Sequence, residues 1–303
     1  MKTPLVSILV STYNHEKYIC DCLDGILMQQ TKFPIEIIVG NDCSTDGTES
    51  IIKQYQKCFS NIKLITPTAN VYQTGKTITY THLLPVAKGK YVAFCEGDDY
   101  WTFPYKLQAQ IEFLERESSY SMCFHSYQTN DSNGNKITLV GVCQEERAIS
   151  ITELLNYGIC QLSTVIGRRE CLSIPEIDLY FNHPQHTYGD INYYMAWASQ
   201  GKIRLLPQPW SIYRRHADSL TANDCLNDTA HIKHQNALNA LIDSYGHKYS
   251  KILRYYKCMY KLNQSSRLIQ EHKYLSGIWQ KISAFFISPK YLLHLYVKKY
   301  NQD

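Results

Sequence analysis

The strongest chemical signal in this sequence is a run of carboxylates, Glu96-Gly97-Asp98-Asp99, which directly follows the apolar residues 91–95. Three acidic side chains within four residues repel one another unless a cation or solvent offsets their charge. Hard divalent cations such as Mg²⁺ and Mn²⁺ take oxygen ligands and are often shared with substrate phosphates. A solvated acidic turn is the plain alternative, but the position after a buried strand favours a Mn²⁺ or Mg²⁺ site.

A second polar cluster, residues 40–48, follows another short apolar run at residues 35–39. Asp42 in this cluster has a carboxylate that could accept hydrogen bonds from a nucleobase or a ribose. Asp46, Gly47 and Thr48 are typical of a loop that caps the next helix. We expect Asp42 to be functional and residues 46–48 to be structural.

A basic cluster, Tyr213-Arg214-Arg215-His216, lies farther along the chain. Arginine and histidine are well suited to a departing diphosphate, and histidine can also ligate a metal. A solvated basic turn would contain the same residues. Of the three basic residues we favour Arg214 and His216 for a role in the site.

The elements that must position these residues alternate between strand and helix. Compact apolar runs predict buried strands at residues 6–11, 35–39, 62–65 and 91–95, and helical spacing predicts helices at 18–27, 48–55 and 104–117. Farther on we expect strands at 121–127, 163–167 and 203–206, a turn at 131–135, a helix at 190–199, and mainly helix after about residue 220. This alternation predicts an α/β fold with a doubly wound, mostly parallel sheet. Ligands bind at the carboxyl ends of such strands, so the polar clusters that follow them should converge.

The composition restricts the class of protein. The 303 residues carry a formal net charge of +4, which is too mild for a nucleic-acid-binding protein, and 44% of them are hydrophobic, as in globular chains. Eleven cysteines at irregular spacings, with no CxxC pair, are most simply explained by a reduced, cytosolic compartment, and no ligand spacing supports zinc. No run of about twenty apolar residues occurs, so we expect no membrane span.

The segment from Ser276 to Tyr300 is apolar and aromatic, with lysines interspersed and Pro289 interrupting it. A basic amphipathic helix of this kind can lie in a membrane interface. A C-terminal helix packed on its own domain would have the same pattern. The sequence favours neither the membrane-interface helix nor the packed helix over the other.

Three stretches of the sequence resemble the family 2 glycosyltransferases, which have the GT-A fold. Residues 4–14 are similar to the family's opening strand, residues 41–48 to its second-strand loop, and residues 96–101 with 106–108 to the metal-binding stretch of a bacterial EGDDYW subgroup. The similarity is continuous from residue 4 to about 118 and patchy to about 220. It implies a GT-A domain at 1–220, with nucleotide-sugar binding in 1–118 and the acceptor side in 119–220, and a helical region at 221–303.

The resemblance also implies roles for single residues. Thr12, Tyr13, Asn14 and Glu16 would line the nucleotide pocket, and Asp42 would contact the base, usually uracil or another pyrimidine. Asp98 would be the chief metal ligand, supported by Asp99 and Glu96. Because Glu96 stands where the family commonly has Asp, the carboxylate that binds the metal directly stays open. The full nucleotide-sugar set is then Thr12, Tyr13, Asn14, Glu16, Asp42, Glu96, Gly97, Asp98 and Arg214, and the metal set is Asp98, Asp99 and His216.

The family places a catalytic acid at the start of a helix beyond the metal site. Asp190, within residues 188–193, matches that place and is the expected base. Gly189 stands where the family often has Glu, and Asp190 would otherwise serve only as a helix cap.

The resemblance implies an inverting, metal-assisted hexosyl- or hexosaminyltransferase in polysaccharide synthesis. The donor would be a nucleotide-diphosphate sugar, with UDP as the nucleotide, and the acceptor a carbohydrate or lipid-linked hydroxyl. We expect a cytoplasmic protein that binds no nucleic acid, with peripheral contact to the inner membrane through its tail as an open possibility. A non-catalytic relic of the fold is the main alternative. A sugar nucleotidyltransferase ranks lower, because residues 11–14 are not a glycine-rich, basic loop.

Overall fold

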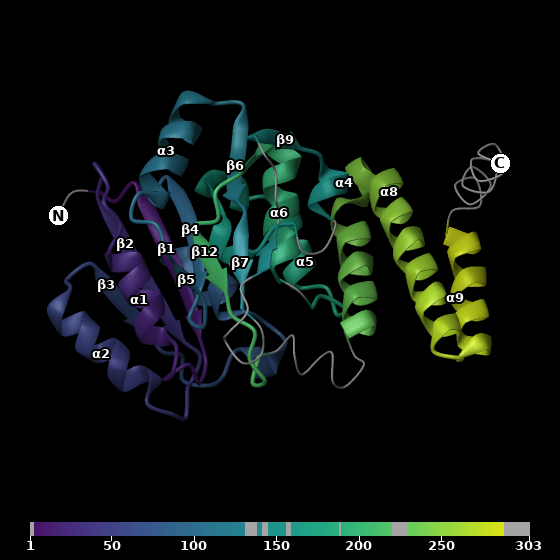
Figure 1. The fold of residues 1–303 in the computed structure, drawn as a ribbon, viewed down its shortest axis with the longest axis horizontal. Coiled ribbons are helices and arrows are strands. Elements are labelled where there is room, and N and C mark those ends of the chain that lie inside the picture. The colour runs from purple at the N-terminus through teal and green to yellow at the C-terminus, as the bar shows by residue number, and fades with distance from the viewer. Residues whose placement is uncertain are drawn as a thin grey trace. The chain divides into compact units, whose positions relative to one another are not determined.

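The structure is a computed structural model that describes residues 3–130, 138–140, 145–155, 159–187, 189–219 and 230–287 (Figure 1). The chain forms two compact units. The first comprises Met1–Ile174 with Tyr193–Asn223, and the second comprises Pro175–Asn192 with Asp224–Asp303. The last change of unit lies near the expected boundary at residue 220. Residues 175–192 group with the C-terminal helices, whereas the sequence assigned them to the first domain.

A mixed sheet of eight strands, in the order β3-β2-β1-β4-β10-β6-β11-β9, forms the centre of the first unit. The strands β1 to β4 run parallel to one another, as do β6 and β11, whereas β10 and β9 are antiparallel to their neighbours. The prediction of an α/β fold with a mostly parallel sheet is confirmed. The strand bounds are β1 (Val6–Thr12), β2 (Ile35–Asn41), β3 (Ile62–Ile65), β4 (Tyr91–Glu96), β6 (Tyr120–His125), β9 (Arg147–Ile149), β10 (Ile166–Arg168) and β11 (Lys202–Leu206).

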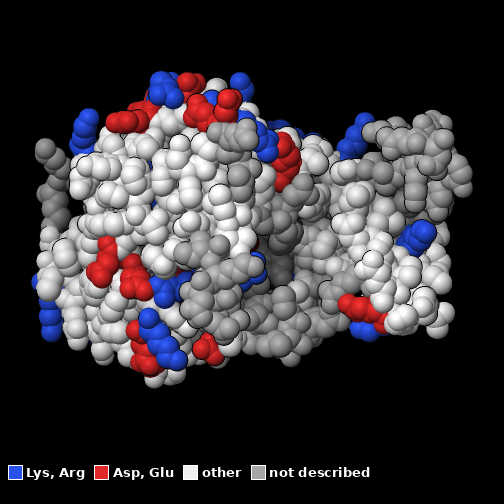
Figure 2. Space-filling model, viewed as in Figure 1, with Lys and Arg blue, Asp and Glu red and all other residues white. Residues whose placement is uncertain are grey.

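The surface of the described residues carries both signs of charge. Figure 2 shows blue and red side chains interspersed over the face that it draws, without a single large patch of either colour. The described charged side chains on this face are therefore mixed and not gathered in one region.

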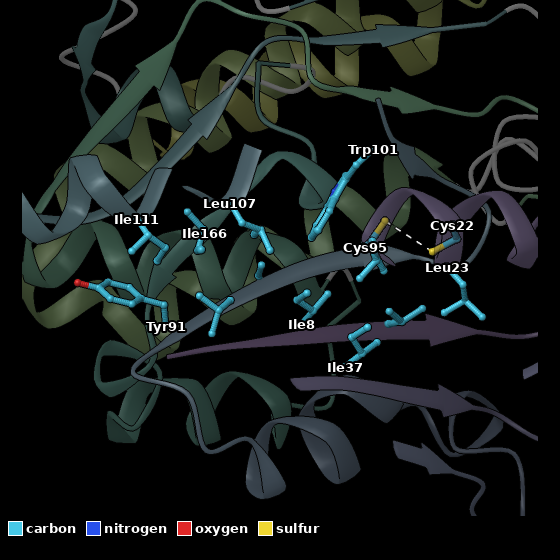
Figure 3. Packing of buried hydrophobic residues seen from close by; sticks show 14 of the residues in the cluster. Ile8, Cys22, Leu23, Ile37, Tyr91, Cys95, Trp101, Leu107, Ile111 and Ile166 are labelled. Atoms are coloured by element: carbon cyan, nitrogen blue, oxygen red, sulfur yellow. Dashed lines mark hydrogen bonds between the residues drawn. The ribbon is translucent and has the colours of Figure 1, made fainter. Parts of the chain in front are cut away.

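Helices follow the strands, as the spacing of apolar residues predicts. They are α1 (Ile19–Leu27), α2 (Thr48–Cys58), α3 (Lys106–Arg116) and α6 (Gly189–Gln200), each close to its expected range. Figure 3 shows how Leu23 of α1 and Leu107 of α3 point toward Ile8 of β1 and the neighbouring strands. In the same core the sulfurs of Cys22 and Cys95 lie 3.7 Å apart as free thiols. Burial of these apolar side chains is the main force that holds the helices on the sheet.

A second, four-stranded sheet in the order β5-β12-β7-β8 was not predicted. Its strands are β5 (Tyr100–Trp101), β7 (Tyr127–Thr129), β8 (Thr138–Val140) and β12 (Ser211–Tyr213). The prediction of one strand at residues 121–127 is wrong, because the chain leaves the large sheet at Ser126 and enters the small one. There the Ser126 N–H donates to the Leu206 carbonyl at 3.0 Å. Strands of two or three residues are too short to show an alternating pattern in the sequence.

Several short elements complete the first unit. The strand expected at 163–167 is instead a 3₁₀ turn, Leu162–Thr164, followed by β10. Further 3₁₀ turns occur at Tyr72–Thr74, Leu84–Val86 and Arg169–Leu172, with a π-helical turn at Thr79–Leu83 and α4 at Ile151–Leu154. The turn expected at residues 131–135 lies outside the described residues.

The second unit is helical, with α5 (Pro175–Phe181), α8 (Ala230–Gln270) and α9 (Tyr274–Ile287). Tyr249 has non-helical dihedral angles, so α8 consists of two segments joined at a kink. The helices α8 and α9 approach closely, since a Cβ on Gly277 would lie 2.7 Å from the Ile269 side chain and 3.1 Å from the Ser265 carbonyl. Among the helices in the described part of the chain, none has the length and apolar character needed to cross a membrane.

Candidate functional site

The carboxyl ends of β1, β2 and β4 lie side by side in the large sheet. In the strand register Thr12 is opposite Asn41, and Ser11 is opposite Glu96. Beyond the ends of β2 and β4, the Asp42 N–H donates to the Thr12 carbonyl at 2.9 Å, and the Gly97 N–H donates to the Ser11 carbonyl at 2.8 Å. The prediction that three polar clusters converge at one edge of the sheet is confirmed.

Asp98 lies between two histidines. Its Oδ2 is 3.0 Å from Nε2 of His216 and 3.8 Å from Nε2 of His15. Burial alone would raise the pKa of Asp98, but the hydrogen bond with His216 and the charges of the two imidazoles hold it below its ordinary value. Burial lowers the pKa of His15, with Asp98 opposing this shift and His216 adding to it. The Asp98 carboxylate is therefore ionised, and it points toward the imidazole nitrogens of His216 and His15.

The small sheet explains how His216 reaches Asp98 across more than a hundred residues. The strand β5, which begins directly after Asp99, pairs antiparallel with β12, with Tyr100 opposite Ile212. Chain direction reverses between the two strands, so residues just before β5 meet residues just after β12. The acidic turn and the basic cluster are thus joined by a short β-ladder.

Gly97 allows the turn to lie close to β1. A Cβ at this position would be 2.8 Å from Cβ and Oγ1 of Thr12, and 2.9 Å from Nδ1 of His15. No side chain fits into that space without displacing its neighbours. The Gly97 of the expected nucleotide-sugar set is thus required for close packing, whatever it contacts in a ligand.

Asp99 differs from its neighbour Asp98 in every contact. It is fully buried, its Oδ2 accepts a hydrogen bond from Nε2 of Gln161 at 2.6 Å, and its Oδ1 accepts one from the Arg214 N–H at 3.0 Å. Burial raises the pKa of Asp99 well above its usual range, and the charges of Asp98 and Glu96 add to this effect. Both oxygens are engaged inside the protein. These contacts favour a structural role over the expected metal role, which stays an untested prediction.

Arg214 directs its guanidinium toward the same site. The group pairs with the Asp21 carboxylate and lies over two tyrosine rings, 4.6 Å from the centroid of Tyr100 and 5.2 Å from that of Tyr18. The Tyr18 ring also packs against His216, with centroids 4.6 Å apart. Tyr18, which precedes α1 as its N-cap residue, and Asp21, in the first turn of α1, therefore hold the basic cluster in place.

Asp42 ties a neighbouring loop to the end of β2. Its carboxylate accepts hydrogen bonds from the N–H groups of Val71 at 2.6 Å and Tyr72 at 3.0 Å, and its carbonyl accepts one from Nδ2 of Asn70 at 2.7 Å. The expected contact with a base is not tested by this arrangement. The role of residues 70–72 was missed in the sequence because the loop has no periodicity.

Asn14 and Glu16 join the loops that follow β1 and β2. Asn14 adopts the left-handed conformation, with φ of 55°, and its Oδ1 accepts a hydrogen bond from the Thr45 N–H at 2.8 Å. Oε2 of Glu16 accepts one from the Gly47 N–H at 2.7 Å, and Oδ1 of Asp46 accepts one from the Thr48 N–H at 3.0 Å. The structural role predicted for residues 46–48 is confirmed, and Asn14 and Glu16 share it.

Thr12 and Tyr13 occupy the tip of β1. The Thr12 side chain is buried, and its hydroxyl has no hydrogen-bond partner among the described residues. Tyr13 is 43% exposed. A partly exposed aromatic ring beside an unpaired hydroxyl is a suitable place for a nucleoside to bind.

Asp190 lies in the first turn of α6, in the part of the chain that belongs to the second unit. Its Oδ1 accepts a hydrogen bond from the Ile191 N–H at 2.9 Å. Burial raises the pKa of Asp190, partly offset by this backbone bond. The prediction that Asp190 begins a helix is confirmed, and its role as a base stays a prediction.

The donor set around Asp98 fits a divalent cation only in part. Within the described residues, no group of three or more His, Cys, Asp or Glu side chains could hold a metal ion by itself. Asp98 offers an oxygen and His216 a nitrogen, and Nδ1 of both His216 and His15 is buried without a partner among these residues. Mn²⁺ and Mg²⁺ commonly complete such incomplete sets with substrate phosphates and water. His15, which adjoins the Tyr13-Asn14 motif, was missed because a lone histidine in a loop carries no spacing signal.

Comparison with known proteins places these observations in a family. Residues 7–168, more than half of the chain, match the family described as Glycosyl transferase family 2. The chain is 34% identical over 221 residues to an uncharacterized protein of Mycobacterium tuberculosis, covering 71% of this chain and 60% of that protein. It is 32% identical over 223 residues to WfaP of Escherichia coli, covering 72% of this chain and 80% of WfaP. WfaP is described as a UDP-Glc:alpha-D-GlcNAc-diphosphoundecaprenol beta-1,3-glucosyltransferase.

Solved structures agree on the fold. The S. aureus TarS fragment 1–349 in complex with UDP-GlcNAc superposes with a TM-score of 0.58 at 17% identity, covering 95% of this chain and 92% of that one. The mannosyltransferase PcManGT from Pyrobaculum calidifontis, in complex with GDP-Man and Mn²⁺, gives 0.56 at 14% identity, covering 100% of this chain and 82% of that one. The α/β architecture described above is thus of the GT-A type.

Proposed function

Because this chain belongs to glycosyl transferase family 2, we propose that it is an inverting glycosyltransferase that uses a nucleoside-diphosphate sugar, with UDP as the nucleotide. One observation carries the proposal: the Asp98 carboxylate and the His216 imidazole meet 3.0 Å apart at the carboxyl ends of β1 and β4. This edge of an open parallel sheet is where such folds bind ligands. The donor and acceptor are part of the proposal, since the chain spans about 60% of the length of its mycobacterial relatives.

The nucleotide and the diphosphate would contact different ends of the site. Thr12, Tyr13 and Asp42 line the side of β1 and β2, where a ribose and a pyrimidine base would bind, with Asn14 and Glu16 supporting the loop. Glu96 and Gly97 would face the ribose, and Asp98 the diphosphate. A bound Mn²⁺ or Mg²⁺ at Asp98 and His216 would supply positive charge for the leaving diphosphate.

Arg214 would contribute a second positive charge to the leaving group. Its guanidinium is at present paired with Asp21 and held over Tyr100 and Tyr18. A diphosphate would compete with the Asp21 carboxylate for the same donors, because guanidinium groups bind both anions through pairs of hydrogen bonds. Arg214 is therefore held in place before the donor arrives.

Asp190 would act as the general base. It would take the proton of an acceptor hydroxyl while that oxygen bonds to the anomeric carbon. At the same time the bond from this carbon to the diphosphate oxygen breaks, and the nucleoside diphosphate leaves. A single displacement of this kind inverts the configuration at the anomeric carbon. Burial raises the pKa of Asp190 toward the range useful for a base near neutral pH.

The acceptor would be a hydroxyl of a carbohydrate or lipid-linked glycan in polysaccharide synthesis. The description of WfaP, with its UDP-Glc donor and diphosphoundecaprenol-linked acceptor, supports this class for a relative of 32% identity. A hexosyl or hexosaminyl donor fits both this description and the UDP-GlcNAc complex of TarS.

We further propose that the chain acts in the cytoplasm and binds the inner membrane peripherally through α9 and the residues after it. Several large apolar side chains on α9 are exposed to solvent, among them Leu275 at 87%, Trp279 at 67% and Phe286 at 77%. Lys281 lies on the same helix and is exposed. A helix that exposes apolar and aromatic side chains and also carries lysine has the chemistry needed to bind an anionic lipid surface.

The proposed activity is tested with the purified chain and a panel of UDP-, GDP- and dTDP-sugars, in Mn²⁺, in Mg²⁺ and in chelator. Release of nucleoside diphosphate is followed in each mixture. We expect release from one UDP-sugar that requires the metal. Release of pyrophosphate from a parallel mixture of UTP and a sugar 1-phosphate would instead indicate a nucleotidyltransferase, and donor binding without any turnover would indicate a non-catalytic relic.

A further inference from the structure

Asp99 is held by two hydrogen-bond donors that come from distant parts of the chain. One is the side-chain amide of Gln161, 2.6 Å from Oδ2, and the other is the main-chain N–H of Arg214, 3.0 Å from Oδ1. The carboxylate is fully buried. A carboxylate whose two oxygens both accept buried hydrogen bonds has its strongest binding directions already in use.

Gln161 is itself fixed in one orientation. Its Oε1 accepts hydrogen bonds from the Ser163 N–H at 2.8 Å and from the Ser163 hydroxyl, so its amide nitrogen must face Asp99. The Ser163 carbonyl in turn accepts a bond from Nε1 of Trp101 at 2.8 Å. The contacts of Asp99 therefore belong to a closed network that links the acidic turn, β5 and the 3₁₀ turn Leu162–Thr164.

From this network we infer that Asp99 and Gln161 form a positioning pair, which holds the main chain at Arg214 and thereby sets His216 against Asp98. Residue 99 acts through Arg214 and touches neither the metal nor the donor. The inference rests on the proposed function, since it explains how the donor site is built. The two adjacent carboxylates then have different roles. Asp98 faces the donor site, and Asp99 faces the buried hydrogen-bond network that holds this site in place.

The carboxylate of Asp99 and the amide of Gln161 can be exchanged between the two positions by substitution. In Asp99→Asn, one oxygen becomes an NH₂ group, which must face either the Gln161 amide or the Arg214 N–H, donor against donor. In Gln161→Glu, a second carboxylate lies against Asp99. In the double variant D99N/Q161E, the amide now at position 99 donates to the carboxylate now at position 161, and its oxygen still accepts from Arg214. The number of carboxylates and the number of hydrogen bonds are both restored.

The test measures UDP binding by calorimetry, with Mn²⁺ and with chelator, for the wild type, both single variants and the double variant. We expect each single variant to bind UDP in Mn²⁺ at least about 10-fold more weakly, because an unpaired buried group is costly enough to displace the main chain that it holds. The double variant should return to within about threefold of the wild type and keep its dependence on Mn²⁺. If position 99 were a metal ligand, the double variant would instead lose the advantage that Mn²⁺ gives.

Thermal melting without any ligand provides a readout that is independent of the donor. The double variant should melt above both single variants, because the pair is coupled directly. A double variant that melts below both would overturn the pairing. A wild type that binds no UDP while the melting temperatures still show coupling would count against the proposed function and leave the pairing intact.

Gln161→Met supplies a second variant that leaves every proposed ligand unchanged. It removes the amide while keeping a side chain of similar volume, so Asp99 loses one of its two donors. We expect weaker binding of UDP in Mn²⁺, and wild-type affinity would overturn the inference. Ser121→Ala is the matched control, since it removes a buried 2.7 Å hydrogen bond to the Trp197 carbonyl in the same unit and outside the network.

Discussion

At the scale of single residues, the site shows how surroundings assign different chemistry to identical side chains. Asp98 and Asp99 are neighbours of the same type, yet the pKa of Asp98 is lowered and that of Asp99 is raised. Histidine rings face the first carboxylate, and an amide and a main-chain N–H face the second. The difference comes from the turn between β4 and β5, in which the two neighbouring side chains meet different parts of the chain.

Replacing Asp98 with alanine should remove the metal dependence of donor binding. The variant loses the oxygen ligand and leaves His216 and His15 facing one another without a carboxylate between them. We expect calorimetry to give the same, weak UDP affinity in Mn²⁺ and in chelator, whereas the wild type should bind more tightly in Mn²⁺. The exposed Glu112→Gln is the control and should behave as wild type. Equal wild-type binding in the two buffers would contradict a metal role.

Replacing Asp190 with asparagine should separate catalysis from binding. A general base acts on the acceptor proton in the transition state, so its loss lowers kcat by on the order of 10²–10⁴-fold. The dissociation constant for the donor should barely change, because the diphosphate is held elsewhere. Sugar transfer and donor affinity are measured on the same preparation, with a thermal melt to verify folding. Transfer at the wild-type rate would mean that Asp190 only caps α6.

At the scale of elements, long segments were predictable and short ones were not. The strands β1, β2 and β4 and the helices α1, α2 and α3 follow from runs of apolar residues, because each buries a whole face or stripe. The ladder between β5 and β12 did not follow. It consists of two or three residues a strand and joins positions more than a hundred residues apart.

The same contrast explains the outcome for the site. The convergence of the polar clusters follows from the parallel sheet alone, since carboxyl ends of adjacent parallel strands share an edge. The partners of those clusters, Gln161 for Asp99 and residues 71–72 for Asp42, come from segments without periodicity. No local pattern encodes such contacts, because they depend on the tertiary path of the chain.

Lys106, at the start of α3, should make the stability of the first unit depend on pH. Its ammonium is fully buried, 4.1 Å from the Trp101 ring centroid, and donates to Oε1 of Gln110 at 2.9 Å. Burial lowers its pKa from 10.5 to about 7. Between these two values the unfolded chain binds a proton that the folded chain does not, so this residue's contribution to stability rises with pH. The contribution is complete above the unfolded pKa and is lost as pH falls to the folded pKa.

Lys106→Met should therefore flatten this dependence. We expect the wild type to gain stability relative to the variant by at most about 1.4 kcal/mol for each pH unit above about 7. Urea unfolding of both proteins at several values between about pH 6 and pH 9 measures the difference. The exposed Lys202→Met is the control and should show no such slope. A constant difference across the range would mean that the buried amine does not titrate there.

At the scale of the whole molecule, two kinds of surface have different physical tasks. The first unit gathers its polar chemistry at one edge of the sheet, and charges of both signs are scattered over the face drawn in Figure 2. The second unit instead exposes apolar side chains along α9. Its opposite side packs on α8, where Cys258 and Ala284 are buried. The proposed membrane contact would use these exposed apolar side chains.

Serine replacement of Trp279 and Phe286 should therefore weaken binding to anionic liposomes. Both side chains are exposed on α9, so folding loses little by the change, whereas the membrane loses the two aromatic groups that would enter its interface. We expect affinity for vesicles containing phosphatidylglycerol to fall on the order of 10-fold or more, at about 25 cal/mol for each Å² of apolar surface withdrawn from water. Co-sedimentation measures the bound fraction.

Leu179→Ser on α5, which is 57% exposed in the same unit, is the matched control and should bind as wild type. UDP affinity should be equal in all three proteins, because the donor residues lie in the first unit. A full-length protein that does not sediment with such vesicles would show that this face of α9 does not bind lipid.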